Sequence, residues 1–200
     1  MICGTINNYY QAKPFIKRIK SLLFLAFALT LSCNSYAESR TISETADEYA
    51  VKAAYIYNIL RFVSWPASSP LANTQSLNIC LFENDPFDQY LAPISKKSIS
   101  KKQIRLKTII KPSDASSCHL VFFEDNEQLE VFKDSDAPFN PGDSILLGDD
   151  IDFVKNGGLF SFYIEDNKVR LGANRTAIAN TDLHISSLLL EVCKLHGGTE

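Results

Sequence analysis

The feature that most constrains the fold is a strongly patterned segment at residues 51–66, VKAAYIYNILRFVSWP. Apolar and aromatic residues recur in it at steps of three and four, which predicts a helix with one mostly apolar face. The residues of that face would be Val51, Ala54, Tyr55, Asn58, Phe62 and Trp65. Pro66 disfavours helical geometry in the residue before it, so the helix should end near Ser64. A helix this aromatic needs a sheet or another chain to cover that face.

The segment before this helix has the layout of a secretory signal peptide. Its basic residues are Lys13, Lys17, Arg18 and Lys20. An apolar stretch follows at 22–31, and as a helix it would extend only about 15 Å, too short for a permanent membrane span. Ser35 and Ala37 place small residues where a signal peptidase reads. We therefore expect residues 1–37 to be a cleaved signal peptide and residues 38–200 to form one periplasmic domain, with lipidation of Cys33 as the alternative.

The charge of the exported chain excludes some functions. The sequence has 20 Lys and Arg and 23 Asp and Glu; residues 1–37 hold four of the basic ones and no acidic one, which leaves 16 against 23 and a net charge of −7. This acidity argues against nucleic acid as a partner, because nucleic acid binding needs a basic footprint. We interpret the lysines at 96–97 and 101–102 as a solvated loop.

Short apolar runs alternate with helical segments after the first helix, which Thr41 and Glu44 should cap. We expect strands at 77–82, 104–110, 119–123 and 144–147, helices after Asp85 and Asp125 and at 150–154, a hairpin of 159–165 and 168–173, and a final helix at 181–195. In the hairpin, Phe160, Phe162 and Ile164 should face the core. The final helix would bury Leu183, Leu188, Leu189, Val192 and Leu195. The pattern predicts an α/β fold: a single three-layer domain whose mixed β-sheet has flanking helices and a late β-hairpin.

No pattern in the sequence is typical of a catalytic or metal site. The three histidines, His119, His184 and His196, are scattered without zinc-ligand spacing, and His119 suits a hydrogen-bonded core position. The glycine pair at 157–158 lacks the features of a phosphate loop, and there is no Gly-x-Ser-x-Gly motif. The acidic residues at 149, 150 and 152 suit a cation or, more simply, a helix start. The sequence therefore predicts no cofactor, no metal and no enzyme.

Four blocks of the sequence carry a resemblance to a known family. They are VKAAYIYNILRFVSWP (51–66), LNICLFENDPF (77–87), CHLVFF (118–123) and the run from GGLFSFYIEDNKVRL to HISSLLLEVCKL (157–195). In this order and spacing the chain resembles the YfiR family of periplasmic proteins. The chain departs from the family pattern at 171–174, where only Asn174 of an acidic-Ile-Asn ending is retained.

The resemblance implies a regulator. Family members are similar to a periplasmic repressor that binds the extracytoplasmic sensor domain of an inner-membrane diguanylate cyclase, which lowers cyclic-di-GMP and restrains biofilm formation. An outer-membrane lipoprotein can sequester such a repressor. The resemblance also implies a disulfide between Cys80 and Cys118, with two free buried thiols as the alternative, and Cys193 should be an unpaired thiol.

The partner-binding surface is a prediction from residue type. Aromatic and arginine residues are frequent interface anchors, which singles out Arg61 near the first helix and Tyr163 and Arg175 near the hairpin. Asn174 joins this set because it lies beside them in the turn after the hairpin. We assign Tyr55 and Trp65 to the core. A homodimer is expected. The alternative function is a periplasmic small-ligand sensor that binds an apolar metabolite in a cleft beside the long helix.

Overall fold

A computed structural model describes the backbone at residues 37–83, 85–134 and 141–197, and side chains from Glu48 onward apart from positions 88 and 141. Nearly all of the predicted signal peptide lies outside these residues. Residues 46–200 form one compact unit, and the description below concerns that unit. No helix in the described part of the chain has both the length and the apolar character that a membrane span requires.

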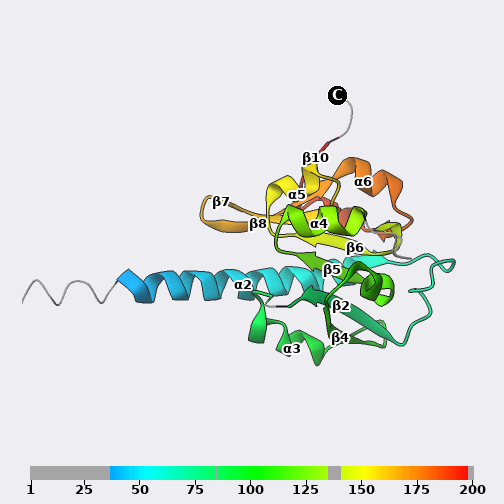
Figure 1. The fold of residues 1–200 in the computed structure, drawn as a ribbon, viewed down its shortest axis with the longest axis horizontal. Helices are drawn as coiled ribbons and strands as arrows, with labels where there is room; N and C mark the ends of the chain where they lie inside the picture. The colour runs from blue at the N-terminus through cyan, green and yellow to red at the C-terminus, as the bar shows by residue number, and fades with distance from the viewer. Residues whose placement is uncertain (1–36, 84, 135–140, 198–200) are drawn as a thin grey trace, which may run out of the picture. The chain divides into compact units, whose positions relative to one another are not determined.

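A mixed sheet of eight strands forms the centre of the unit (Figure 1). In spatial order its strands are β10 (Cys193–His196), β8 (Lys168–Asn174), β7 (Phe160–Glu165), β6 (Ile145–Gly148), β5 (Leu120–Phe123), β2 (Ser76–Phe82), β4 (Lys102–Ile109) and β3 (Ser98–Ile99). The strands from β7 to β4 run parallel, β8 and β3 are antiparallel to their inner neighbours, and β10 is parallel to β8. A separate antiparallel pair joins β1 (Val63–Ser64) to β9 (His184–Ile185). The predicted α/β fold with a mixed sheet is confirmed.

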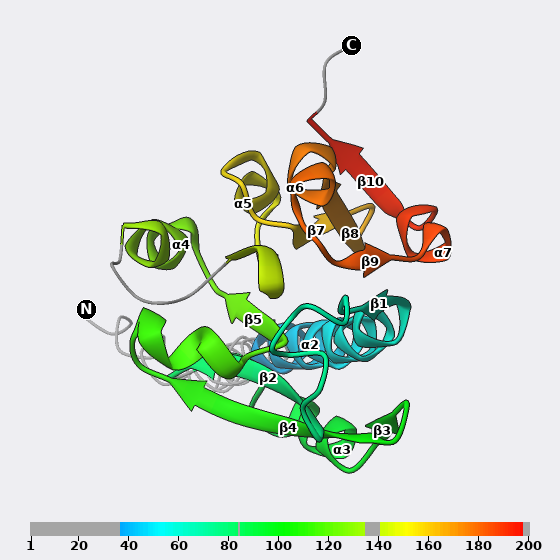
Figure 2. The same cartoon turned by 90° about the vertical axis from the view of Figure 1, so that its right-hand side faces the viewer.

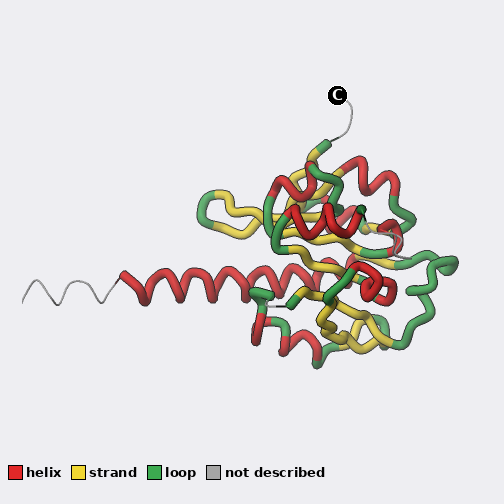
Figure 3. Tube along the Cα trace, viewed as in Figure 1, coloured by secondary structure: helices red, strands yellow, loops and turns green. Residues whose placement is uncertain are grey.

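Helices cover both faces of this sheet, as Figures 2 and 3 show. The helix α2 (Ala37–Phe62) covers one face, and α4 (Asn126–Lys133) and α5 (Ile151–Lys155) cover the other. The shorter elements are η1 (Asp88–Tyr90), α3 (Ala92–Ser95), η2 (Pro112–Ser117), η3 (Pro141–Asp143), α6 (Arg175–Asn180) and α7 (Ser187–Leu190). The neighbours Phe122 and Phe123 point to opposite faces, Phe122 against Phe87 and Phe123 against Phe132. The predicted three layers are present.

The buried face of α2 differs from the predicted one. Val51 is 44 % exposed and Ala54 and Asn58 are exposed, whereas the helix buries Lys52, Ala53, Ile56, Ile59 and Leu60. The segment carries two apolar stripes at helical spacing, and the more aliphatic one is buried. Lys52 conceals this stripe in the sequence, because a lysine is seldom buried without a partner. The helix also begins at Ala37 rather than after Thr41, and it ends at Phe62.

The predicted C-terminal helix at 181–195 is wrong. The chain forms β9, the four-residue α7 and β10 there, and Leu188, Val192 and Leu195 are 59, 62 and 40 % exposed. Ser186 begins α7 with a hydroxyl that accepts from the Leu188 amide, and β10 then adds to the edge of the sheet beside β8. Strand pairing with a segment some twenty residues away overrides the local helical periodicity.

The predicted hairpin is confirmed between β7 and β8. Asp166 and Asn167 have φ of 52° and 57°, the positive values that a tight two-residue hairpin turn requires. Phe160 and Phe162 are fully buried, but Ile164 is 52 % exposed because it lies one residue before the end of its strand. The predicted core position of Ile164 is therefore wrong.

Candidate partner-binding surface

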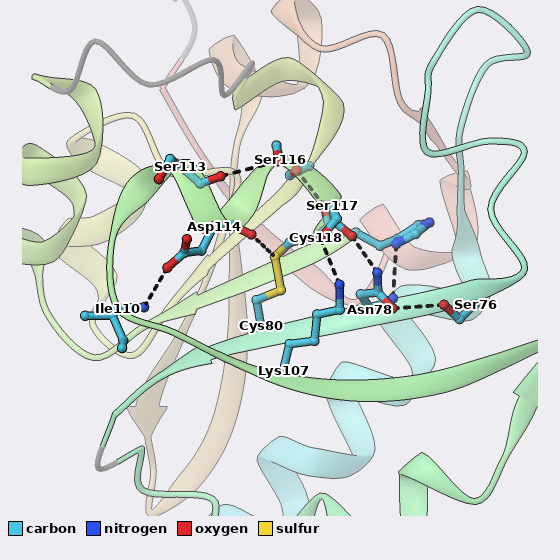
Figure 4. Close-up of a disulfide and its surroundings, with 12 residues drawn as sticks. Ser76, Asn78, Cys80, Lys107, Ile110, Ser113, Asp114, Ser116, Ser117 and Cys118 are labelled. Atoms are coloured by element: carbon cyan, nitrogen blue, oxygen red, sulfur yellow. Dashed lines mark hydrogen bonds between the residues drawn. A yellow bond between two sulfur atoms is a disulfide. The ribbon is translucent and has the colours of Figure 1, made fainter.

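A disulfide joins the inner strand β2 to the segment that leads into its neighbour β5 (Figure 4). Cys80 lies in β2, and Cys118 lies two residues before the neighbouring strand β5. Their Cα atoms are 5.8 Å apart, and both side chains are fully buried. Asn78 supports the same junction, because its amide Nδ2 donates to the Ser117 carbonyl at 2.7 Å. The two cysteines are 38 residues apart in the sequence. Their bond therefore holds the start of β5 against β2, the strand beside it.

His119, next to this disulfide, is a hydrogen-bonded core residue. Its Nδ1 accepts from the backbone amide of Asn78 at 3.0 Å. The other ring nitrogen, Nε2, therefore carries the proton and donates to the Leu71 carbonyl at 3.1 Å. The Trp65 ring packs edge-on at 4.8 Å. Burial lowers the pKa of His119 to about 4. The ring is therefore neutral and structural, as predicted.

A buried ion network lies where α2 crosses the carboxyl end of β6. The Lys52 side chain is 4 % exposed, and its Nζ is 2.5 Å from Glu48 Oε1 and 2.6 Å from Asp149 Oδ1. The Tyr49 hydroxyl donates to the other Asp149 oxygen at 3.1 Å. Burial raises the pKa of Asp149, an effect that Lys52 opposes, and burial followed by the Asp149 charge raises the pKa of Tyr49. This network fastens the helix to the sheet.

The acidic residues at 149–152 do not converge on a cation. Asp150 caps α5 by accepting from the Asp152 amide at 2.7 Å, and Asp152 pairs with Lys155 at 2.5 Å. Asp149 is engaged by Lys52. In the described residues, no group of His, Cys, Asp and Glu side chains is arranged to hold a metal ion. The helix-start interpretation is confirmed for Asp150.

The structure separates the residues that the sequence suggests for partner binding. Arg61 is exposed on α2, where its guanidinium lies 5.8 Å from the Tyr57 ring. Phe162 faces α2, since its ring centroid lies 6.0 Å from that of Tyr55. Tyr163 is the next residue of the same strand, so it lies on the opposite face of the sheet, where it is half-buried. Arg175 is exposed at the start of α6. These residues do not form one surface, and their role stays a prediction.

Asn174 is not a surface residue. It is 8 % exposed, its side-chain oxygen accepts from the Ala177 amide at 2.9 Å to cap α6, and its Nδ2 donates to the Val154 carbonyl. Both polar atoms of its side chain therefore make hydrogen bonds inside the fold. We therefore withdraw it from the partner-binding set.

Exposed apolar side chains mark two places on the surface that sequence reasoning missed. Val51 on α2 and Leu188, Val192 and Leu195 near the C-terminus are all at least 40 % exposed. The β1–β9 pair and a Ser186 amide bond to the Phe62 carbonyl at 2.9 Å place the start of α7 beside the end of α2. Leu195 pairs in register with Ala173, which is opposite Phe160, so it faces the α2 side of the sheet. Val51 lies eleven residues, or about 16 Å, before this end of α2. Val51 and the C-terminal group are therefore two separate exposed apolar sites, and each is a candidate for contact with a partner.

A cavity of about 290 Å³ lies elsewhere, between β6, β7 and α6. Its walls include Ser144, Leu146, Leu159, Ala177 and Thr181, and it has no charged side chain among its lining residues. It is not the cleft beside the long helix that the sequence suggests. Its size is at the lower limit for a small-molecule site.

The described residues define a disulfide-braced α/β domain with a mixed sheet. The chain belongs to the YfiR/HmsC-like family, whose model matches residues 49–194. No curated protein matches this sequence. A solved structure of a conserved domain protein from Vibrio cholerae is similar at 12 % identity, over 72 % of this chain and 59 % of that one, with a TM-score of 0.44. This chain therefore spans less than two thirds of that structure's length.

Proposed function

We propose that this protein is a periplasmic regulator that binds and inhibits the extracytoplasmic sensor domain of an inner-membrane diguanylate cyclase. Inhibition would lower cyclic-di-GMP and so restrain biofilm formation. Membership of the YfiR/HmsC-like family is the observation that carries this proposal. An outer-membrane lipoprotein is a further partner by the same resemblance, as a competitor that releases the cyclase.

Export is part of the proposal. Residues 1–37 would be removed as a signal peptide, which leaves residues 38–200 as the mature domain, and the disulfide of Cys80 and Cys118 suits an oxidising compartment. Mass spectrometry of the protein recovered from the periplasm should give an N-terminus at Glu38. An intact Met1 in the mature protein would contradict export by this route.

The exposed apolar groups near α2 and α7 support a binding role. Val51, Leu188 and Val192 lie outside the core, and covering such side chains with a partner removes apolar surface from water, which favours association. A second copy of the chain would cover them in a homodimer, and the sensor domain would cover them in a complex. Arg61 lies on the same helix and supplies an interface anchor of favoured type.

The decisive experiment compares strains with and without the cyclase. Deleting the gene for this protein should raise cyclic-di-GMP where the cyclase is present and change nothing where it is absent. Val51→Asp and Arg61→Glu should each weaken capture of the sensor domain by at least tenfold, because each places a charge or a reversed charge at the contact. The matched control Val131→Asp changes a residue that is 58 % exposed on α4, on the other face, and should leave capture unchanged.

The cavity between β6, β7 and α6 supports the alternative function, a small-ligand sensor. Because its walls are uncharged, it suits a small neutral or largely apolar molecule. Calorimetry against such compounds tests this alternative, and Ala177→Phe, which would fill the cavity, should abolish any heat of binding. Heat that persists in Ala177→Phe would place the ligand elsewhere.

A further inference from the structure

A basic segment occupies one edge of an otherwise acidic protein. Residues 96–111 contain seven Lys and Arg residues and no Asp or Glu, although the whole sequence has a net charge of −3. We call this set the basic edge: Lys96, Lys97, Lys101, Lys102, Arg105, Lys107 and Lys111. Sequence reasoning treats part of it as a solvated loop. Three members contact neutral groups of the fold: Lys102 Nζ donates to the Ala72 carbonyl at 2.5 Å, Lys107 Nζ donates to the Ser117 hydroxyl at 2.9 Å, and Lys97 Nζ lies 4.5 Å from the Tyr57 ring. The proposed partner site uses none of the seven charges.

The basic edge lies along β3 and β4, the last two strands at one side of the sheet. β3 turns back into β4 through Ser100 and Lys101, which have φ of 50° and 70°. β3 pairs only with Lys102 and Gln103, so the rest of β4 has no strand on its outer side in the described residues. Every member of the basic edge except Lys102 is exposed. Figure 2 shows β4 and β3 at the lower end of the sheet, away from α7 and β10.

The charges of the basic edge are not neutralised. Across the described residues none of its members forms an ion pair, whereas five of the eight other Lys and Arg residues with described side chains do, namely Lys52, Lys133, Lys155, Arg170 and Lys194. Their field extends into the protein, because Lys102 and Lys107 add to the lowering of the His119 pKa that burial begins. An unpaired positive surface of this kind attracts an anionic partner.

One apolar side chain protrudes from the same segment. Ile110 is 73 % exposed, more than any other large hydrophobic residue described, and Lys111 follows it directly. Lysines next to an exposed aliphatic residue are the pattern of an interfacial membrane contact, in which the charges lie at headgroups and the apolar group enters the interface.

We propose that the basic edge docks the protein on an anionic phospholipid surface, with Lys96, Lys101 and Arg105 on headgroup phosphates and Ile110 in the interface. A protein partner fits less well, because lysine is depleted and aromatic residues are enriched where proteins bind proteins. The basic edge has six lysines and no aromatic residue.

Membrane docking deepens the proposed function and rests on it, because the proposed partner is anchored in a membrane. A regulator that binds the same membrane is at a higher local concentration near that partner. A competing explanation is that lysines on an open strand edge prevent edge-to-edge aggregation. That explanation predicts no affinity for lipid, so the two are separable.

Vesicle sedimentation with the naturally processed protein recovered from the periplasm tests the proposal. We expect binding to vesicles that contain phosphatidylglycerol, little binding to pure phosphatidylcholine, and loss of binding as salt screens the charges. The triple variant K96Q/K101Q/R105Q should reduce the partition coefficient at least tenfold, since each basic group contributes roughly fivefold near an anionic surface. Ile110→Ser should reduce it further at every salt concentration.

The matched control is K133Q/K155Q/K168Q. It also removes three positive charges, but from α4, α5 and β8 instead of the basic edge. It should bind vesicles like the wild type, and an equal loss would show that net charge rather than the basic edge drives binding. No binding to anionic vesicles by the wild type would overturn the proposal and leave the edge-protection explanation. Capture of the soluble sensor domain, measured without lipid, is expected to be unaffected by K96Q/K101Q/R105Q, so this proposal and the proposed function fail independently.

Discussion

The Nζ atom of Lys52 lies 2.6 Å from the Asp149 carboxylate, and this contact ties α2 to the carboxyl end of β6. Lys52 would be unfavourable on a buried helix face without this partner. The two residues are far apart in sequence, so the pair forms only when the helix is seated on the sheet. It therefore reports on correct docking of the helix whose outer face carries Val51 and Arg61.

Replacing this lysine should destabilise the fold. Lys52→Met leaves Asp149 and Glu48 without a cation in a largely buried site, so the free energy of unfolding should fall by about 3 kcal/mol. Urea denaturation gives this difference. Lys155→Met breaks an exposed pair with Asp152 and should change stability by less than about 0.5 kcal/mol. Equal effects of the two variants would show that burial of the Lys52 network contributes nothing.

His119 should make stability depend on pH. Its pKa is lowered to about 4 by burial, so between about 6.5 and 4 the unfolded chain binds a proton that the folded chain does not. This contribution is complete above about pH 6.5 and is lost as the pH falls toward 4, by up to about 3 kcal/mol. The raised pKa of Asp149 acts in the opposite sense, because that carboxylate is protonated more readily in the folded state.

The comparison with His119→Gln isolates this contribution. Glutamine keeps one acceptor for the Asn78 amide and one donor for the Leu71 carbonyl but does not titrate. The variant should be less stable than the wild type at neutral pH, and the difference should shrink as the pH falls toward 4. A constant difference across this range in urea titrations would contradict the assignment.

The disulfide should supply a large share of the stability. Joining Cys80 to Cys118 across 38 residues lowers the entropy of the unfolded chain, so C80A/C118A should lose about 4 kcal/mol. Thermal denaturation of the oxidised and reduced wild type should show a similar loss. Cys193→Ser alters a half-buried thiol outside any disulfide and is the control, with a change below about 1 kcal/mol. A C80A/C118A variant as stable as the wild type would contradict the brace.

The sequence predicts the sheet well because its signals are local. Short apolar runs bounded by turn residues mark β2, β5 and β6, and Asp166 with Asn167 marks the hairpin, since each signal lies within the element that it predicts. The helix start at Asp125 is also local, because its carboxylate accepts from the Gln128 amide at 2.9 Å.

The wrong predictions concern residues whose environment is set by a segment that is distant in the sequence. The buried face of α2 depends on Asp149, which neutralises Lys52 and admits that stripe to the core. The last strand depends on β8, which Cys193 and Leu195 join in register. Asn174 resembles a surface residue in the sequence, but its side chain is buried and donates a hydrogen bond to the Val154 carbonyl. None of these partners is visible in the local pattern.

Asn174 should therefore affect stability rather than partner binding. Asn174→Ala removes the cap of α6 and one of the donors to the buried Val154 carbonyl, which keeps the Gly157 amide at 3.4 Å, so the free energy of unfolding should fall by about 1 to 2 kcal/mol. Asn174→Asp keeps the acceptor for the Ala177 amide but loses the donor, so its loss should be intermediate. Arg175→Ala changes the exposed neighbour and should leave stability within about 0.5 kcal/mol of the wild type. Below the unfolding transition, Asn174→Ala should capture the sensor domain as the wild type does. A stable Asn174→Ala variant that fails to capture it would return this residue to the partner-binding surface, because only a direct contact separates binding from folding.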